Sequence, residues 1–150
     1  IARYRVLLTP EYLETADLKR GRALYTQTCG ACHKLFGEGG AIGPELTGAD
    51  RQTLEYWLSN LIDPSGVVPA GYVMSVVLMN DGRVLNGVVA SRSRSVVVLQ
   101  TASERINLDV ADIEEIQPTG QSLMPEGQLT ALTDEQARDL IGYLMSNGSD

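Results

Sequence analysis

The sequence contains few of the residues from which metal sites and disulfide frameworks are built. Its 150 residues include one histidine and two cysteines, too few for the four Cys or His ligands of a usual structural zinc site. No apolar run approaches the length that spans a membrane, and no basic stripe is present to neutralise the phosphates of a nucleic acid. We therefore expect neither a membrane span in this chain nor a nucleic-acid partner.

The chain also lacks an initiator methionine and a secretion signal, since it opens on Ile1. We interpret this start as that of a fragment or a processed form. At 43% hydrophobic residues the chain can bury a globular core, and its length allows one domain, or one small domain with a compact insert. The net charge of −7 is concentrated in residues 119–150. Such a segment is either a solvated helix face or a surface that steers a basic partner.

One stretch carries most of the chemical information, Cys29-Gly30-Ala31-Cys32-His33. A C-x-x-C-H run is the attachment signature of a c-type haem. Cysteines three positions apart lie on one side of a helical turn, so Cys29 and Cys32 can form thioethers with the haem vinyl groups while His33 directs its imidazole at the iron. The alternatives are a zinc site, a thioredoxin-like dithiol and a chance match. A dithiol of that kind follows a strand, whereas the residues before Cys29 have the pattern of a helix.

Three segments have the apolar spacing and the capping residues of helices. They are predicted over 17–29, 54–61 and 133–144. In the first, Gly21 costs stability relative to alanine, which suggests the close approach of another helix. Residues 1–15 contain a Thr-Pro pair that disfavours a helix, and we predict that they form a linker or docking arm.

Between the second and third helices the periodicity becomes that of short strands. The predicted strands cover 72–79, 83–90, 95–101, 105–110 and 113–117. Asp81-Gly82 is a strong two-residue hairpin turn between the first two strands. An open sheet of this size has vulnerable edges, so we expect it to close into a small barrel or to curl against the helices. Residues 119–128 are predicted to return to loop.

Two residues after the motif are candidates for contacts with a bound haem. Proline keeps its carbonyl oxygen, so Pro44 is suited to accept a hydrogen bond from the outer nitrogen of His33, which would orient an axial imidazole; the alternative is an ordinary turn. Trp57 is most economically a core residue, but its indole N–H needs a partner when buried, and a haem propionate is one candidate. Gly37–Gly40 is predicted to be a flexible loop.

Together with a G-x-x-x-aromatic pattern at Gly21 and Tyr25 and an L-x-x-Y pattern at Leu140 and Tyr143, these features resemble a class I cytochrome c. The order of the segments over residues 16–147 is similar to that of bacterial haem-binding cytochrome c domains with a strand-rich insert before the methionine loop.

The resemblance implies a mainly α cytochrome c fold with an inserted antiparallel β meander or barrel, α+β overall. Its core would comprise 16–66 and 119–150, and the insert 67–118. In that family Cys29 and Cys32 would be the thioether attachments of haem c, His33 the proximal ligand with Pro44 as its carbonyl partner, and Met124 the distal ligand.

The distal ligand can also be considered by elimination. Because His33 is the only histidine, bis-histidine ligation within one chain is excluded. Of the four methionines, Met145 lies in the last predicted helix, whereas Met74 and Met79 lie on predicted strands. Met124 lies in a predicted loop, directly before a proline that stiffens the backbone. We favour Met124, with Met79 or an open site as the alternatives.

Six-coordinate iron with a soft thioether ligand indicates an electron relay with a raised potential rather than an enzyme. We expect electrons to come from a fused or docked dehydrogenase and to pass to a redox partner protein, in the periplasm or another extracytoplasmic compartment. The alternatives are a haem-based sensor or ligand-binding domain with a displaceable sixth ligand, and a haem-free interaction module built on the strands.

Overall fold

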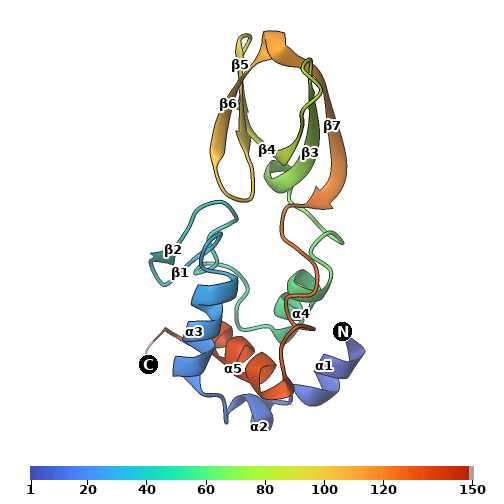
Figure 1. Cartoon of the computed structure of the whole chain (residues 1–150). Coiled ribbons are helices and arrows are strands. Elements are labelled where there is room, and N and C mark those ends of the chain that lie inside the picture. Colours follow the sequence, from blue (N-terminus) through green and yellow to red (C-terminus); the bar gives the residue numbers. More distant parts are fainter. Residues whose placement is uncertain (149–150) are drawn as a thin grey trace. The chain divides into compact units, whose positions relative to one another are not determined.

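The structure is a computed structural model, and residues 1–148 are described (Figure 1). It divides into two compact units. Unit 1 comprises Ile1–Asp63 and the chain from Glu126 onward, and unit 2 comprises Pro64–Pro125. Unit 1 is helical apart from one small hairpin, and unit 2 is built on a five-stranded sheet. The chain is therefore mixed α+β, as predicted.

Unit 1 contains all the helices predicted from the sequence. Its elements are α1 (Ala2–Leu7), α2 (Pro10–Leu13), α3 (Leu18–Thr28), β1 (Lys34–Leu35), β2 (Glu38–Gly39), α4 (Leu54–Ile62) and α5 (Asp134–Met145). The Asp17 side chain accepts the Arg20 N–H at the start of α3, and Thr133 and Gln136 form a reciprocal capping box at the start of α5. The predicted starts of these two helices are thus confirmed.

The first residues are more ordered than the sequence indicated, because two short helices occupy most of the predicted arm. Tyr4 and Leu8 are buried, so α1 packs onto unit 1. Pro10 stands at the first position of α2, where its missing N–H costs no hydrogen bond, and the Thr9 hydroxyl accepts the Tyr12 N–H at 3.3 Å. The Thr-Pro pair therefore starts a helix instead of preventing one.

Helices α3 and α5 cross at Gly21, as its position in the sequence suggested. A Cβ atom on this glycine would collide with the carbonyl oxygen of Asp139 and would lie 2.7 Å from Cβ of Tyr143. Beside the crossing, the rings of Tyr25 and Tyr143 lie 5.8 Å apart. The glycine lets the two backbones touch, and the aromatic pair fixes the rotation of α3 about its axis.

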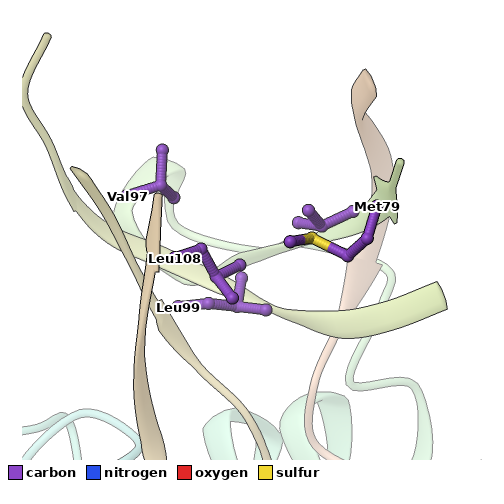
Figure 2. Packing of buried hydrophobic residues seen from close by; sticks show 5 residues of the cluster. Met79, Val97, Leu99 and Leu108 are labelled. Carbon is purple, nitrogen blue, oxygen red and sulfur yellow. The ribbon is translucent and has the colours of Figure 1, made fainter. Parts of the chain in front are cut away.

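Unit 2 is an antiparallel sheet in the order β6-β5-β4-β3-β7. Its strands are β3 (Val73–Met79), β4 (Val84–Arg92), β5 (Val96–Gln100), β6 (Arg105–Asp109) and β7 (Ile113–Ser122), with 3₁₀ turns η1 (Ala70–Tyr72) and η2 (Val110–Asp112). The inner face buries one apolar cluster, and four of its members are labelled in Figure 2: Met79, Val97, Leu99 and Leu108. Among the described strands β6 and β7 remain the two edges, so the expected closure into a barrel is not found.

Strand β7 is about twice as long as the sequence predicted, and it includes residues assigned to a loop. Ser122 pairs with Val73 and Pro118 with Ser75, so residues 119–121 lie opposite Met74 alone. This insertion is a bulge that lets pairing resume beyond an irregular stretch. The local sequence of residues 119–122 favours a loop. Ser122 belongs to the sheet only because it pairs with Val73 of β3, which a local pattern does not reveal.

Candidate functional site

The Cys29–His33 motif forms a tight turn at the C-terminal end of α3. Cys29 caps the helix, and its carbonyl oxygen accepts hydrogen bonds from the N–H groups of Cys32 (3.1 Å) and His33 (2.9 Å). Both cysteines are free thiols; Cys29 is buried and Cys32 is half-buried. Burial raises the pKa of the Cys29 thiol. The turn brings two thiols and the imidazole-bearing residue together at one helix end.

The imidazole of His33 is held by the residue that the sequence indicated. Its Nδ1 lies 2.8 Å from the carbonyl oxygen of Pro44. A carbonyl oxygen can only accept, so Nδ1 is the donor in this hydrogen bond, and in the neutral imidazole Nε2 is the nitrogen with the free lone pair. The described part of the chain offers Nε2 no hydrogen-bond partner. The arrangement therefore orients the His33 ring so that, in its neutral form, Nε2 can serve as a metal ligand.

Where the sequence predicted a flexible loop over Gly37–Gly40, the chain forms the β1–β2 hairpin, and the backbone that follows is hydrogen-bonded to the motif. The N–H of Gly40 donates to the Gly30 carbonyl at 2.8 Å, and the N–H of Gly43 donates to the Cys32 carbonyl at 2.7 Å. A Cβ atom on Gly40 would collide with the Ala31 carbonyl, and one on Gly43 would lie 2.6 Å from Cε1 of His33. These glycines allow backbone to pack directly on the motif. Sequence reasoning missed them because a collision requires knowledge of the facing atoms.

Tyr25 is a second residue whose polar role the sequence did not reveal. Its hydroxyl donates to the carbonyl oxygen of His33 at 2.6 Å, and the carbonyl of Glu38 lies 3.1 Å away. Burial, with smaller contributions from Cys29 and Tyr143, raises the pKa of Tyr25 to about 12. The hydroxyl stays protonated at neutral pH and ties α3 to the backbone of the predicted axial ligand.

Trp57 lies in the core of unit 1, with 3% of its surface exposed. Its indole N–H donates to the carbonyl oxygen of Arg51 at 3.0 Å, and its ring meets that of Tyr56 edge-on. The Arg51 carbonyl is therefore the hydrogen-bond partner of the indole N–H, for which a haem propionate was one candidate. The structure places Trp57 as a core residue whose polar atom is already satisfied.

The methionines occupy different environments. Met79 is 2% exposed, and its side chain reaches into the apolar cluster of unit 2 (Figure 2). Met124 follows β7, and its N–H donates to Oγ of Ser122 at 3.1 Å. His33 belongs to unit 1 and Met124 to unit 2. The packing of Met79 gives its thioether a structural role, which weakens the alternative that it is the distal ligand.

The acidity of the last segment is partly neutralised by the fold. Asp139 is fully buried and bonds to Arg20 and Arg138, while Asp134 is paired with Arg3. Pairing of this kind removes most of the long-range field of a carboxylate. Two of the carboxylates of this segment, Asp134 and Asp139, are therefore paired within unit 1.

The chemistry of these donors fits a c-type haem. The two cysteines are not joined in a disulfide, and Nδ1 of His33 is bonded to the Pro44 carbonyl, which leaves Nε2 as the nitrogen that would bind iron. A neutral imidazole whose other nitrogen donates to a backbone carbonyl is the usual form of a histidine metal ligand. With α3 crossed by α5 at Gly21 and the motif at the C-terminal end of α3, the fold of unit 1 and the site are consistent with a cytochrome c-like haem-binding domain.

Comparison with known proteins supports this class. The family model described as cytochrome c matches residues 18–84, which contain the motif, Pro44 and α4. Cytochrome c domains bind haem covalently and serve electron transfer, and they are generally not catalytic by themselves. Curated proteins yield no match to the chain. Within residues 1–148, no helix combines the length and apolar character that crossing a membrane requires.

Proposed function

We propose that this chain is an electron relay that holds one haem c on Cys29 and Cys32, with His33 as the proximal ligand and Met124 as the distal ligand. The observation that carries the proposal is the 2.8 Å bond between Nδ1 of His33 and the Pro44 carbonyl, because it orients the ring with Nε2 as the nitrogen left for a metal, in the same turn as two free cysteines. When bound, the haem supplies a one-electron exchange at its iron.

The chain's own residues would keep this site rigid. Pro44 holds the tautomer and the plane of the His33 ring, and Gly43 lets the backbone press against that ring. The Tyr25 hydroxyl fixes the His33 carbonyl, so the position of the proximal ligand follows that of α3. A site that moves little between two oxidation states is suited to electron transfer.

The distal ligand decides between a relay and a sensor. A protein thioether in the sixth position blocks small ligands and, being soft, favours the ferrous state and raises the potential. We assign this role to Met124, which follows the end of a strand, because the Met79 side chain is buried in the apolar cluster of unit 2. A raised potential suits a protein that accepts electrons from a dehydrogenase and passes them to a redox partner.

The partner and the compartment follow from the same proposal. The donor would be a fused or transiently docked dehydrogenase, since electron-transfer contacts are typically small in area. Haem is attached to C-x-x-C-H proteins outside the bacterial cytoplasm or in organelles, so we expect an extracytoplasmic location.

Spectroscopy of protein from a host able to attach c-type haem tests the relay. The ferric form should show the near-infrared band of a thioether–iron bond, and Met124→Ala should lose it. Met74→Ala is the matched control and should keep the band. Carbon monoxide should leave the ferrous spectrum of the parent protein nearly unchanged. Strong binding of carbon monoxide together with an absent near-infrared band would instead identify a sensor or ligand-binding domain.

A further inference from the structure

The stretch of β7 that leads to Met124 is held by an unusual series of hydrogen bonds. Residues 119–121 bulge out opposite Met74, and the Thr119 hydroxyl donates to the Met74 carbonyl at 2.8 Å. The N–H of Gln121 donates back to the Thr119 hydroxyl at 3.1 Å, and Gly120 adopts a positive φ of 73°. These hydrogen bonds and the positive φ of Gly120 together fix the backbone path of residues 119–121.

Ser122 extends this anchoring to the predicted ligand. Its N–H donates to the Ser65 hydroxyl at 3.2 Å, and it pairs with Val73 in the sheet. Its own hydroxyl accepts the N–H of Met124 at 3.1 Å. A serine that accepts the N–H two residues onward closes a small local turn. The backbone of Met124 is therefore bonded to the hydroxyl of Ser122, a residue that itself pairs in the sheet.

We propose that Ser122 is a positioning residue for the Met124 thioether and that the bulged end of β7 sets how firmly this thioether is held on the haem iron. The inference rests on the proposed function, in which Met124 is the distal ligand. It concerns the backbone that precedes Met124, whose path is set by the β3–β7 register. Bulges commonly re-aim side chains next to functional sites, which is the behaviour inferred here.

The inference predicts how strongly the Met124 thioether competes with an added ligand for the haem iron. A distal methionine held by fewer hydrogen bonds is displaced more easily by an added ligand, because the bound state of the thioether is less favoured. One hydrogen bond of this kind corresponds to roughly a three- to tenfold change in an equilibrium constant. Imidazole is the probe, since it binds ferric haem and replaces a methionine.

The experiment compares Ser122→Ala, Ser122→Thr and a control, Ser103→Ala, in the ferric holo-protein. Ser103 is an exposed residue of unit 2 whose hydroxyl makes no hydrogen bond within the described chain. We expect Ser122→Ala to bind imidazole about three- to tenfold more tightly than the parent protein and to weaken the near-infrared band. The threonine variant keeps the hydroxyl and should restore both properties, and the control should not change either.

Thr119→Val provides a second variant one step earlier in the series, should Ser122→Ala fold poorly. It removes the hydroxyl that holds the bulge and should also tighten imidazole binding. A structural defect alone would lower the melting temperature without changing the band or the imidazole affinity. Equal imidazole affinity in Ser122→Ala, Thr119→Val and the control, with Met124→Ala still losing the band, would overturn this inference and leave the relay intact. A Met124→Ala protein with an unchanged spectrum would instead overturn the proposed distal ligand.

Discussion

Asp139 offers the sharpest test of how unit 1 is held together, because it is a charged residue with no exposed surface. Its carboxylate accepts the N–H of Asp17 at 3.0 Å, Nε of Arg20 at 2.5 Å and Nε of Arg138 at 2.8 Å. These bonds join α5 to the N-terminal end of α3, whose other end carries the haem motif. The substitution Asp139→Asn keeps the shape and removes the charge.

The expected cost follows from these contacts. Removing one partner from a buried ionic group costs about 3–5 kcal/mol, and a hydrogen bond to a charged group contributes about 1.5–3 kcal/mol. The Arg20 side chain is 52% exposed, so water compensates part of the loss and we expect about 2–4 kcal/mol. For a unit of this size that corresponds to a fall in Tm on the order of 10–20 °C.

The pH dependence has a defined sign. Burial by itself raises the pKa of Asp139, but the hydrogen bonds from Asp17, Arg138 and Arg20 outweigh it, and the pKa lies below its ordinary value. A lowered carboxyl pKa stabilises the folded state above the unfolded pKa of about 4, and this contribution is lost as the pH falls through the folded pKa. The difference in Tm between the parent protein and Asp139→Asn should be complete at neutral pH and should shrink on acidification.

The assay is thermal unfolding of the holo-protein, followed by far-UV circular dichroism across pH. The matched control is Asp134→Asn, which breaks the exposed pair with Arg3 and should lower the Tm much less than Asp139→Asn, because water replaces an exposed ion pair at little cost. Two results would contradict the assignment of a stabilising buried carboxylate. One is an equal Tm for Asp139→Asn and Asp134→Asn, and the other is a Tm difference between Asp139→Asn and the parent that does not change with pH.

Two further substitutions test the contacts around the motif. Gly43→Ala places a methyl group 2.6 Å from the His33 ring, so we expect an altered ferric spectrum and a loss of about 1–3 kcal/mol in the free energy of unfolding. The control is Gly48→Ala, whose methyl group meets no atom within 4 Å. Its free energy of unfolding, measured by thermal unfolding, should stay within about 0.5 kcal/mol of the parent. Tyr25→Phe removes the donor to the His33 carbonyl and should cost about 1–2 kcal/mol by urea unfolding, whereas an unchanged midpoint would show that this bond contributes nothing.

Local sequence signals were sufficient for the helices that bear the site. Asp17 and the Thr133–Gln136 pair cap helices because their side chains satisfy N–H groups within three residues, so no distant contact is needed. Gly21 indicated a helix crossing because glycine within a helix needs a compensating reason. Pro44 was found in the same way, from the one polar atom that proline retains.

Features that depend on distant partners were not predictable. Gly37–Gly40 was interpreted as a flexible loop, and the close packing at Gly40 and Gly43 was not predicted, because only the folded structure brings the Ala31 carbonyl and the His33 ring against these two glycines. The end of β7 was interpreted as a loop because its pairing with Val73 is a long-range contact across a bulge. For these glycines and for the end of β7, the conformation depends on contacts with residues distant in the sequence, which local patterns do not contain.

The central claim is that Cys29 and Cys32 carry one covalent haem. The most direct measurement is the mass of the denatured chain purified from a host that attaches c-type haem, with a Cys29→Ala/Cys32→Ala variant beside it. The account predicts that the parent chain exceeds its polypeptide mass by one haem, that this haem survives acid-acetone extraction, and that the variant shows the polypeptide mass alone. A parent chain at its bare polypeptide mass, produced in a host whose attachment machinery is shown to be active, would contradict the account.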